Sequence, residues 1–339
     1  MKYALAIITL VISSLLIGNV SEVFDHNKKD PLRDEGISKT LSALGEAHPD
    51  HYLDSISDEM IQRGEELIFF GRTTSPNGSK SKQISKFYKC ISCHNTVKED
   101  PNLAEVNPER RLDYAREMNI PYLQGSTFYG IVNRETWYND DYVLKYGNLV
   151  TKAKNSLEGS IQLCAEVCSQ GRTLEDWEIE SMLAYLWSIE LKRSDLNWTA
   201  YDEKKMYESS DAERIQFLKS KYLTKSPATF GSLPKSKADG YEGLIGNPEK
   251  GKVIYELGCK HCHREQGESD VVLDDSKATF NWLKRNIPSN SDLSIYEIIR
   301  KGTYSAEGHK EYMPHYTMEK MSNQQLEDLR SYIESEAKK

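Results

Sequence analysis

Apolar side chains recur at helical spacing over two long stretches of the chain, residues 174–189 and 324–333. In both stretches apolar residues recur three or four positions apart, as they do on one face of a helix. Thr173 and Ser322 precede the two stretches and are predicted to cap the N-termini of the helices. We expect these helices to close two successive structural units.

Each closing helix has an earlier counterpart in the chain. Residues 58–70 show helical spacing and open on acidic residues, which favour a helix N-terminus. Residues 251–258 repeat this pattern in a shorter form. The order of opening helix, cysteine-containing turn, variable stretch and closing helix therefore occurs twice, and it predicts a divergent repeat of one all-helical unit.

The remaining segments are polar or irregular. Residues 21–57 carry scattered charges and a His48-Pro49 break, and they are predicted to be a tether or a loosely packed arm. Residues 200–222 are charged and predicted to be helical, and residues 225–248 are rich in proline and glycine and suit a linker. The expected order is a polar arm over 21–57, a first domain over 58–192, a linker with a charged helix over 193–246 and a second domain over 247–339.

The first twenty residues indicate where the protein works. Lys2 precedes Tyr3–Val20, a segment that is almost wholly apolar, as in a secretory signal or an uncleaved membrane anchor. No cysteine follows this segment, which argues against a bacterial lipoprotein. We expect an exported, periplasmic protein that is either soluble or anchored by its N-terminus.

Two copies of the pattern C-x-x-C-H carry the chemistry: Cys90, Cys93 and His94, and then Cys259, Cys262 and His263. This pattern is the attachment site of a c-type haem, in which two thiols form thioethers to the porphyrin and the imidazole becomes an axial iron ligand. A zinc site or a redox-active cysteine pair is the alternative, but structural zinc requires four gathered ligands. The sequence therefore predicts two covalently bound haems.

Charge and composition limit the partners. The formal net charge is −8 before any haem propionates are added, which argues against nucleic acid and favours a basic or neutral protein partner. The chain has 20 tyrosines, and such aromatic side chains suit walls packed around flat apolar cofactors.

With these motifs, each unit resembles a class I cytochrome c domain. The resemblance covers about residues 58–192 and 247–336. It implies a small all-helical fold in which the first and last helices cross beside the haem. Its motifs are specific for the cofactor and not for a reaction, and the function that it implies is single-electron transfer between a redox protein donor and an acceptor.

The sixth iron ligand of the second unit has a candidate in Met313. Tyr312-Met313-Pro314 lies between the haem motif and the closing helix, where class I cytochromes place a ligating methionine. A thioether ligand raises the reduction potential. The rival candidates are Met318, Met321, His309 and His315.

The first unit has no Met-Pro pair in the corresponding place. Cys164 and Cys168 stand there instead, directly before the closing helix, and Met118 is a spare candidate. A thiolate ligand would lower the potential of the first haem and separate it from that of the second. The two cysteines are also candidates for a disulfide or for core packing, although positions four apart on a helix are poorly placed for a disulfide.

The segment around Cys164 has a second resemblance, to thiosulfate dehydrogenases and to the haem-bearing A subunit of the thiosulfate-oxidising Sox system. About 30 residues carry it, and the matched positions are Cys164, Gly171 and Arg172. It implies that Cys164 is an axial ligand of an active-site haem and that Arg172 helps to hold a small sulfur oxyanion. The extra Cys168 departs from that pattern, and Arg172 alternatively stabilises a helix by its charge.

Aromatic residues gather between Phe128 and Tyr146, where they are predicted to form a haem wall or a substrate pocket. The leading functional hypothesis is an exported dihaem cytochrome c that transfers single electrons. The alternative is a thiosulfate dehydrogenase-like enzyme that uses Cys164 and Arg172. A dihaem peroxidase and a subunit of a respiratory complex are weaker alternatives.

Overall fold

The computed structural model describes residues 35–223, 228–303 and 312–339. These parts of the chain are helical, and their only β-structure is three isolated bridges. The prediction of an all-α fold is confirmed. None of the helices described has the length and apolar character needed to span a membrane. The predicted N-terminal signal or anchor and the rival ligand His309 lie outside the described residues.

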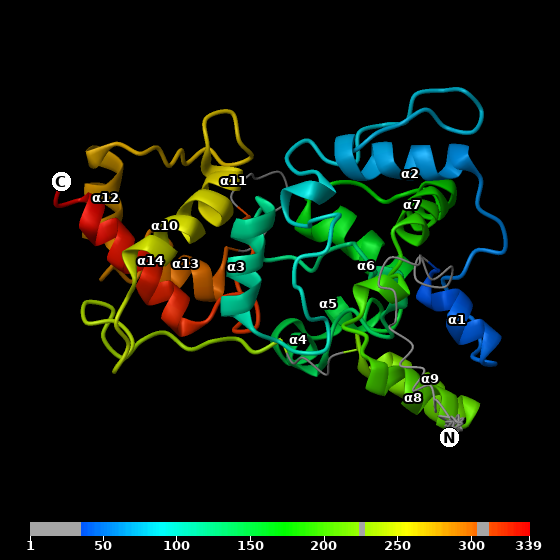
Figure 1. Ribbon diagram of the computed structural model, residues 1–339. Helices are drawn as coiled ribbons and strands as arrows, with labels where there is room; N and C mark the ends of the chain where they lie inside the picture. The colour runs from blue at the N-terminus through cyan, green and yellow to red at the C-terminus, as the bar shows by residue number, and fades with distance from the viewer. Residues whose placement is uncertain (1–34, 224–227, 304–311) are drawn as a thin grey trace, which may run out of the picture.

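The helices form two groups (Figure 1). The first group, which we call the N-lobe, contains α1 (Ile37–Ala43), α2 (Asp58–Phe70), α4 (Asp140–Tyr146), α5 (Asn148–Thr151), α6 (Leu157–Leu163), α7 (Asp176–Ser188), α8 (Ala200–Glu208) and α9 (Asp211–Ser220). The second group, the C-lobe, contains α10 (Pro248–Ile254), α11 (Lys260–His263), α12 (Lys277–Asn286), α13 (Ile295–Lys301) and α14 (Asn323–Glu336). Between the two groups lies α3 (Pro108–Met118). Five shorter helical segments complete the described chain: η1 (Cys90–Ser92), η2 (Ile131–Asn133), η3 (Cys164–Cys168), η4 (Arg193–Asp195) and η5 (Tyr255–Cys259).

A crossing of two helices organises the N-lobe. At Gly64 the backbone of α2 approaches α7 so closely that a Cβ atom there would lie 1.9 Å from the carbonyl oxygen of Ser181 and 2.8 Å from the Cβ of Tyr185. Only glycine fits at this point, because a real Cβ atom cannot come so near a backbone oxygen. Leu67 and Ile68 of α2 are fully buried beside the crossing.

The C-lobe contains a crossing of the same kind, between α10 and α14. A Cβ atom at Gly251 would lie 2.0 Å from the carbonyl oxygen of Asp328 and 2.8 Å from the Cβ of Tyr332. In both lobes a Cβ atom at the glycine would meet a backbone oxygen of the partner helix. It would also meet the tyrosine that follows that oxygen's residue by four positions. The helix of each pair that carries the glycine also precedes a C-x-x-C-H turn in the chain.

One of the two predicted caps is correct. Ser322 caps α14, and its hydroxyl accepts a hydrogen bond from the Gln325 amide. Thr173 does not cap α7, because the helix begins at Asp176 and is capped by Glu175, whose partner in a capping box is Glu178. The Thr173 hydroxyl instead donates to Glu166 at 2.6 Å.

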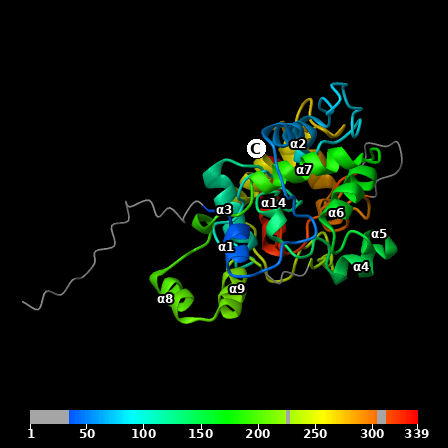
Figure 2. The same ribbon diagram turned by 90° about the vertical axis from the view of Figure 1, so that its right-hand side faces the viewer.

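The described part of the segment before α2 touches the N-lobe at a few points, and most of its residues from 44 to 57 are exposed or half-buried. Ile37 has no exposed surface, and Gly36 forms a β-bridge with Lys192. His51 is 4% exposed, and its Nε2 donates to the Val132 carbonyl at 2.9 Å. The charged helix predicted over 200–222 is two helices, α8 and α9, which project from the N-lobe (Figure 2).

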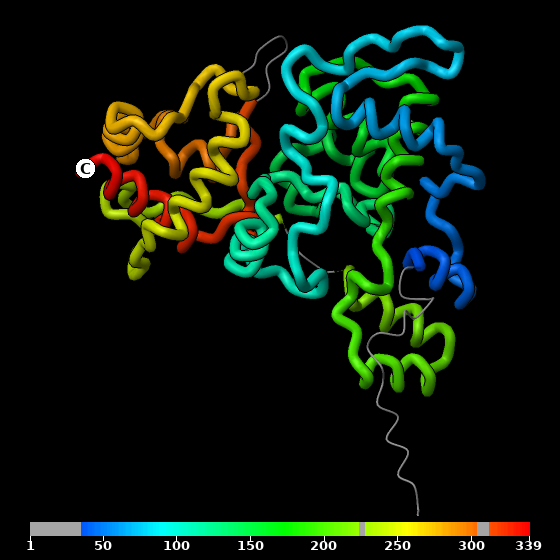
Figure 3. Tube along the Cα trace, turned by 45° about the horizontal axis from the view of Figure 1, so that its top comes forward, coloured from blue at the N-terminus to red at the C-terminus, as the bar shows by residue number. Residues whose placement is uncertain are grey.

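Helix α3 and the turn after it pack into the core of the C-lobe. Leu112, Ala115 and Tyr122, from α3 and the turn after it, are buried in the same core cluster as Ile254 and Leu326 of the C-lobe. Figure 3 shows α3 against the C-lobe, although the chain on either side of it runs through the N-lobe. The two lobes are thereby held together by buried apolar surface.

Residues 228–247 run along the C-lobe before the chain enters α10. The Tyr241 amide donates to Glu327 at 2.8 Å, and the Asn247 amide donates to Asp328 at 2.7 Å. Both acceptors belong to α14, so this part of the predicted linker is fixed to the second unit.

Candidate functional site

The first C-x-x-C-H turn lies at a cavity of about 1100 Å³. Cys90, Cys93 and His94 line the cavity, together with apolar side chains of the two crossed helices, among them Leu67, Ile68, Met182 and Leu186. Ligand pockets in proteins usually measure about 300–1000 Å³ and are mostly apolar. The cavity is therefore large enough and apolar enough for a flat macrocyclic cofactor.

Backbone contacts fix the orientation of His94. Its Nδ1 donates to the carbonyl oxygen of Ser126 at 2.6 Å, and its ring stacks on Phe128 with the centroids 4.5 Å apart. A Cβ atom at Gly125 would lie 2.8 Å from Nδ1, so glycine is needed for this approach. Burial lowers the pKa of His94, which keeps the imidazole neutral. With Nδ1 engaged, Nε2 is left to act as a metal ligand.

The second C-x-x-C-H turn repeats this arrangement. Its first cysteine, Cys259, ends η5, its other residues form α11, and Nδ1 of His263 donates to the Val271 carbonyl at 2.8 Å. Cys259 and Met313 both pack against the buried C-lobe core. Thr303 holds the Met313 backbone through two hydrogen bonds, of 2.9 Å to its carbonyl and 2.6 Å from its amide.

Side chains of residues 312–315 face both sites. Met313 packs on the C-lobe core, whereas Tyr312, Pro314 and His315 line the cavity of the N-lobe. Met318, one of the rivals of Met313, lies with its sulfur against Gly231, and the other, Met321, is 1% exposed in the core. Met118 is 56% exposed at the end of α3 and does not line the cavity.

The two C-x-x-C-H turns touch each other. The His261 Nε2 donates to the Ile91 carbonyl at 3.3 Å, and the Cys262 sulfur lies 3.5 Å from the Ser92 carbonyl oxygen. The Ser92 hydroxyl donates to Glu268 at 3.0 Å. Figure 1 shows α11 beside the first turn. Cofactors attached to these turns would therefore be neighbours.

The thiols of the two turns lie in surroundings that disfavour charge. Burial raises the pKa of Cys90, Cys259 and Cys262 to about 12. Burial also raises the pKa of Cys93, with further contributions from Cys262 and Cys168. Among the described residues, no group of three or more Cys, His, Asp or Glu side chains is arranged to hold a metal ion. The zinc interpretation therefore has no ligand set in this part of the chain.

Cys164 and Cys168 line the same cavity as the first turn. They begin and end η3, a π-helical turn, and they are free cysteines joined by a hydrogen bond between their side chains. The Tyr312 hydroxyl also hydrogen-bonds to Cys168. These two hydrogen bonds lower the pKa of Cys168, while the bond to Cys168 and burial raise that of Cys164.

Arg172 does not share this cavity. Its Nη1 and Nη2 donate to the two carboxylate oxygens of Glu178 at 2.7 and 2.6 Å, and Nη2 also donates to the Lys82 carbonyl. Glu178 is fully buried, so Arg172 neutralises the charge of a capping residue of α7. The role of Arg172 in holding an oxyanion therefore receives no support from the geometry. Gly171 is packed against the Ile84 backbone.

Basic side chains at the cavity were not marked by any sequence motif. Arg134 lines it, and burial lowers the pKa of this residue; Lys320, whose pKa burial lowers to about 8, also lines it but is paired with Glu99. Cations held in such surroundings would pair with the carboxylates of a cofactor. The residues present thus fit a covalently attached haem: two thiols, a neutral imidazole, an apolar slot and the Arg134 cation for a propionate.

Aromatic side chains close one end of the cavity. Tyr138, Tyr142 and Tyr146 contact one another edge-on or stacked, and Phe230 and His315 complete the cluster. The predicted wall or pocket between Phe128 and Tyr146 therefore does line the cavity. The Nε2 atom of His315 is buried and has no hydrogen-bond partner.

Glu99 links the lobes at the edge of the cavity. Its carboxylate accepts hydrogen bonds from Arg111 of α3 at 3.1 Å and from Lys320 of the C-lobe at 2.6 Å. The side chains of Glu99 and Arg111 are only 8% and 5% exposed. Burial alone would raise the pKa of Glu99, but the two cations outweigh it and hold the pKa far below its usual value.

Because the pKa of Glu99 is lower in the folded state, the carboxylate stabilises the protein above about pH 4.5 and loses this effect as the pH falls further. We expect Glu99→Gln to lower the free energy of unfolding by about 2 kcal/mol at pH 7 and to reduce the loss of stability on acidification. Urea unfolding at pH 7 and pH 4 measures both. The control Glu208→Gln removes an exposed pair with Lys204 and should cost about 0–1 kcal/mol. Equal effects of the two variants would contradict the linking role of Glu99.

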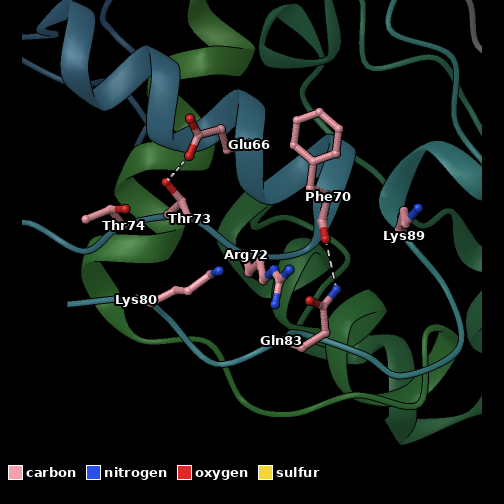
Figure 4. Close-up of a pocket in the computed structure, with 8 residues that line it drawn as sticks. All are labelled: Glu66, Phe70, Arg72, Thr73, Thr74, Lys80, Gln83 and Lys89. Carbon is pink, nitrogen blue, oxygen red and sulfur yellow. Dashed lines mark hydrogen bonds between the residues drawn. The ribbon is translucent and has the colours of Figure 1, made fainter. Parts of the chain in front are cut away.

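A second hollow, of about 630 Å³, lies on the outer side of α2. In Figure 4 Thr73 donates to Glu66, and Gln83 donates to the Phe70 carbonyl. Arg72, Lys80 and Lys89 make its lining basic. These contacts fix the loop between α2 and the first C-x-x-C-H turn.

Comparison with known proteins gives one match. Residues 248–337 match the family model described as Cytochrome c. No curated protein and no solved structure matches the chain. The matched segment contains the second C-x-x-C-H turn, Met313 and the crossing of α10 with α14. Residues 248–337 are thus similar to a cytochrome c domain, which suggests haem-based electron transfer for this part of the chain.

Proposed function

We propose that the protein is an exported dihaem cytochrome c, which passes single electrons between redox proteins through two covalently attached haems. The proposal extends the cytochrome c assignment of residues 248–337 to the N-lobe. Its support is that the N-lobe has the same parts: a helix crossing at a glycine, a C-x-x-C-H turn and a histidine whose Nδ1 is held by a backbone carbonyl.

The contact between the two C-x-x-C-H turns is the observation that carries the proposal. The side chains of His261 and Cys262 touch the backbone of Ile91 and Ser92. Two haems bound to these turns would therefore meet near their attached edges. An electron could pass from one to the other without leaving the protein, which suits a carrier between a donor and an acceptor.

Each iron would take one ligand from its own motif and a second from a different part of the chain. His94 and His263 supply the imidazoles, and Met313 and Cys164 are the proposed sixth ligands. A thioether raises the potential of a haem, and a thiolate lowers it. The two haems would then differ in potential, which gives the transfer a direction.

Location and partners follow from the same chemistry. Covalent attachment of this kind takes place on the outer side of the membrane, and the apolar segment Tyr3–Val20 supports export to the periplasm, with or without anchoring. The net charge of −8 supports donors and acceptors with basic or neutral docking surfaces.

A thiosulfate dehydrogenase-like activity is the second candidate, and one observation favours it. Cys164 lies in the cavity that holds Cys90, Cys93 and His94, as a ligand of an active-site haem would. Against it, Arg172 is paired with Glu178 away from the cavity. Electron transfer therefore remains the preferred function.

A potentiometric titration of purified protein tests the preferred function. We expect two one-electron steps at different potentials. Met313→Ala should lower the higher of the two and leave the other unchanged, because it removes only the thioether ligand. The control Met318→Ala removes a methionine of the same loop and should change neither step.

Three results would contradict the proposal. A single one-electron step would reject two haems of different potential. An unchanged titration of Met313→Ala would reject Met313 as a ligand, and a lowered potential in Met318→Ala would assign the ligand to that residue instead.

A further inference from the structure

The two cysteines outside the C-x-x-C-H turns are only partly explained by electron transfer, which uses at most one of them as an iron ligand. Cys164 and Cys168 both line the cavity of the first turn, and they are the two ends of one π-helical turn. Both are free cysteines. Two neighbouring thiols beside a redox cofactor can be oxidised to a disulfide within the molecule, which a single thiol cannot do.

The local backbone brings the two thiols together. Cys164 and Cys168 are the ends of a single π-helical turn, in which the Ser169 amide donates to the Cys164 carbonyl at 2.8 Å. In an α-helix, Cβ atoms four residues apart are separated by about 5–6 Å, whereas a disulfide needs about 3.5–4.5 Å. A π-turn contains more residues per turn, so residues four apart lie more nearly above one another. Such turns recur at functional sites.

The surroundings connect this pair to both C-x-x-C-H turns. The Tyr312 hydroxyl hydrogen-bonds to Cys168. Cys90 and Cys93 line the same cavity as Cys164 and Cys168, and the Cys262 sulfur of the second turn lies 3.5 Å from the Ser92 carbonyl oxygen of the first. Sulfur atoms therefore follow one another from η3 through the first turn to the second.

We propose that Cys164 and Cys168 are a redox-active dithiol, which gives up two electrons and becomes a disulfide, with one electron for each of two haem irons. The inference rests on the dihaem function proposed above. Two S–H bonds break, one S–S bond forms, two protons pass to water, and two ferric irons become ferrous. The number of irons matches the number of electrons that the dithiol releases.

The disulfide also needs a source of electrons to return to the dithiol. Thiol–disulfide exchange with an external dithiol transfers the S–S bond to that molecule and restores both thiols. The substrate class is therefore a dithiol reductant, which is oxidised while the two irons are reduced. The disulfide form cannot supply the Cys164 thiolate, so the same step changes the ligand set of the first iron.

Thiol counting on the holoprotein tests this inference. One sample is oxidised with excess ferricyanide, and a second is reduced with dithiothreitol. Both are quenched in acid, unfolded, alkylated with iodoacetamide and weighed by mass spectrometry. The four motif cysteines are blocked as thioethers, so we expect two alkyl groups on the reduced protein and none on the oxidised protein.

Single variants show that the change belongs to this pair. Cys164→Ser and Cys168→Ser should each carry one alkyl group in both states, because neither can form the S–S bond. Two alkyl groups on the oxidised native protein would overturn this inference and leave the dihaem function intact. No alkyl group on the reduced native protein would overturn it as well, because the disulfide would then be permanent. More than two alkyl groups on the reduced protein would mean unattached haems, and would overturn the dihaem function and this inference with it.

Discussion

Replacing His94 by alanine is expected to remove one of the two low-spin haem signals, and His263→Ala is expected to remove the other. Each imidazole is oriented by a single backbone carbonyl, Ser126 for His94 and Val271 for His263, and alanine leaves the corresponding iron without its proximal ligand. Electron paramagnetic resonance of the ferric protein measures the two signals separately. The effect is large because the axial ligand itself is lost.

His261 provides the matched control. It stands within the second C-x-x-C-H turn, but its Nε2 contacts the Ile91 carbonyl instead of a cofactor position. His261→Ala should therefore keep both low-spin signals. An unchanged spectrum in His94→Ala would reject a haem at the first turn, and loss of a signal in His261→Ala would reject the assignment of His263.

Gly64→Ala and Gly251→Ala are each expected to lower the free energy of unfolding by about 3 kcal/mol. The new Cβ would lie 1.9 Å from the Ser181 oxygen in one lobe and 2.0 Å from the Asp328 oxygen in the other, so each helix pair must move apart. Urea unfolding monitored by circular dichroism measures the loss. Both variants are expected to act by the same mechanism, because the two crossings have the same contacts.

Gly243→Ala separates crowding from backbone strain. Gly243 has a φ of 77° with open space around it, so alanine there should cost only about 1 kcal/mol. If Gly64→Ala cost no more than Gly243→Ala while Gly251→Ala cost about 3 kcal/mol, the close crossing in the N-lobe would be contradicted. The argument that the N-lobe repeats the cytochrome c domain would then lose its main structural support.

The local features of the fold could be predicted from the sequence because they depend on local patterns. Residues 58–70 form a helix with the predicted bounds, and Ser322 caps the last helix, since helical spacing and capping side chains act over a few positions. The cap of α7 was misassigned because Glu175 competes with Thr173 and forms a capping box with Glu178.

The contacts between the lobes could not be predicted in this way. Nothing in the sequence near Leu112 or Tyr122 indicates that these residues are buried in the C-lobe core. The same holds for Tyr312 and His315, which reach from the C-lobe loop into the cavity of the N-lobe. Such contacts join residues far apart in the chain, and single-sequence patterns report only on neighbours.

The candidate site could be predicted only where its residues form local motifs. The C-x-x-C-H motifs are local, and so is the spacing of Cys164 and Cys168, although a helical spacing argued against their contact until the π-turn was known. Arg134, Lys320 and Glu99 come from separate segments and belong to no motif. Only folding brings these charges to one cavity.

The central claim is that two haems are attached to this chain, one to each C-x-x-C-H turn. The most direct test is the intact mass of the purified holoprotein, followed by the masses of the peptides that contain Cys90–Cys93 and Cys259–Cys262. We predict a protein heavier than the processed chain by two haems, with one haem on each peptide. A mass that corresponds to one haem, carried only by the peptide from residues 248–337, would contradict the claim.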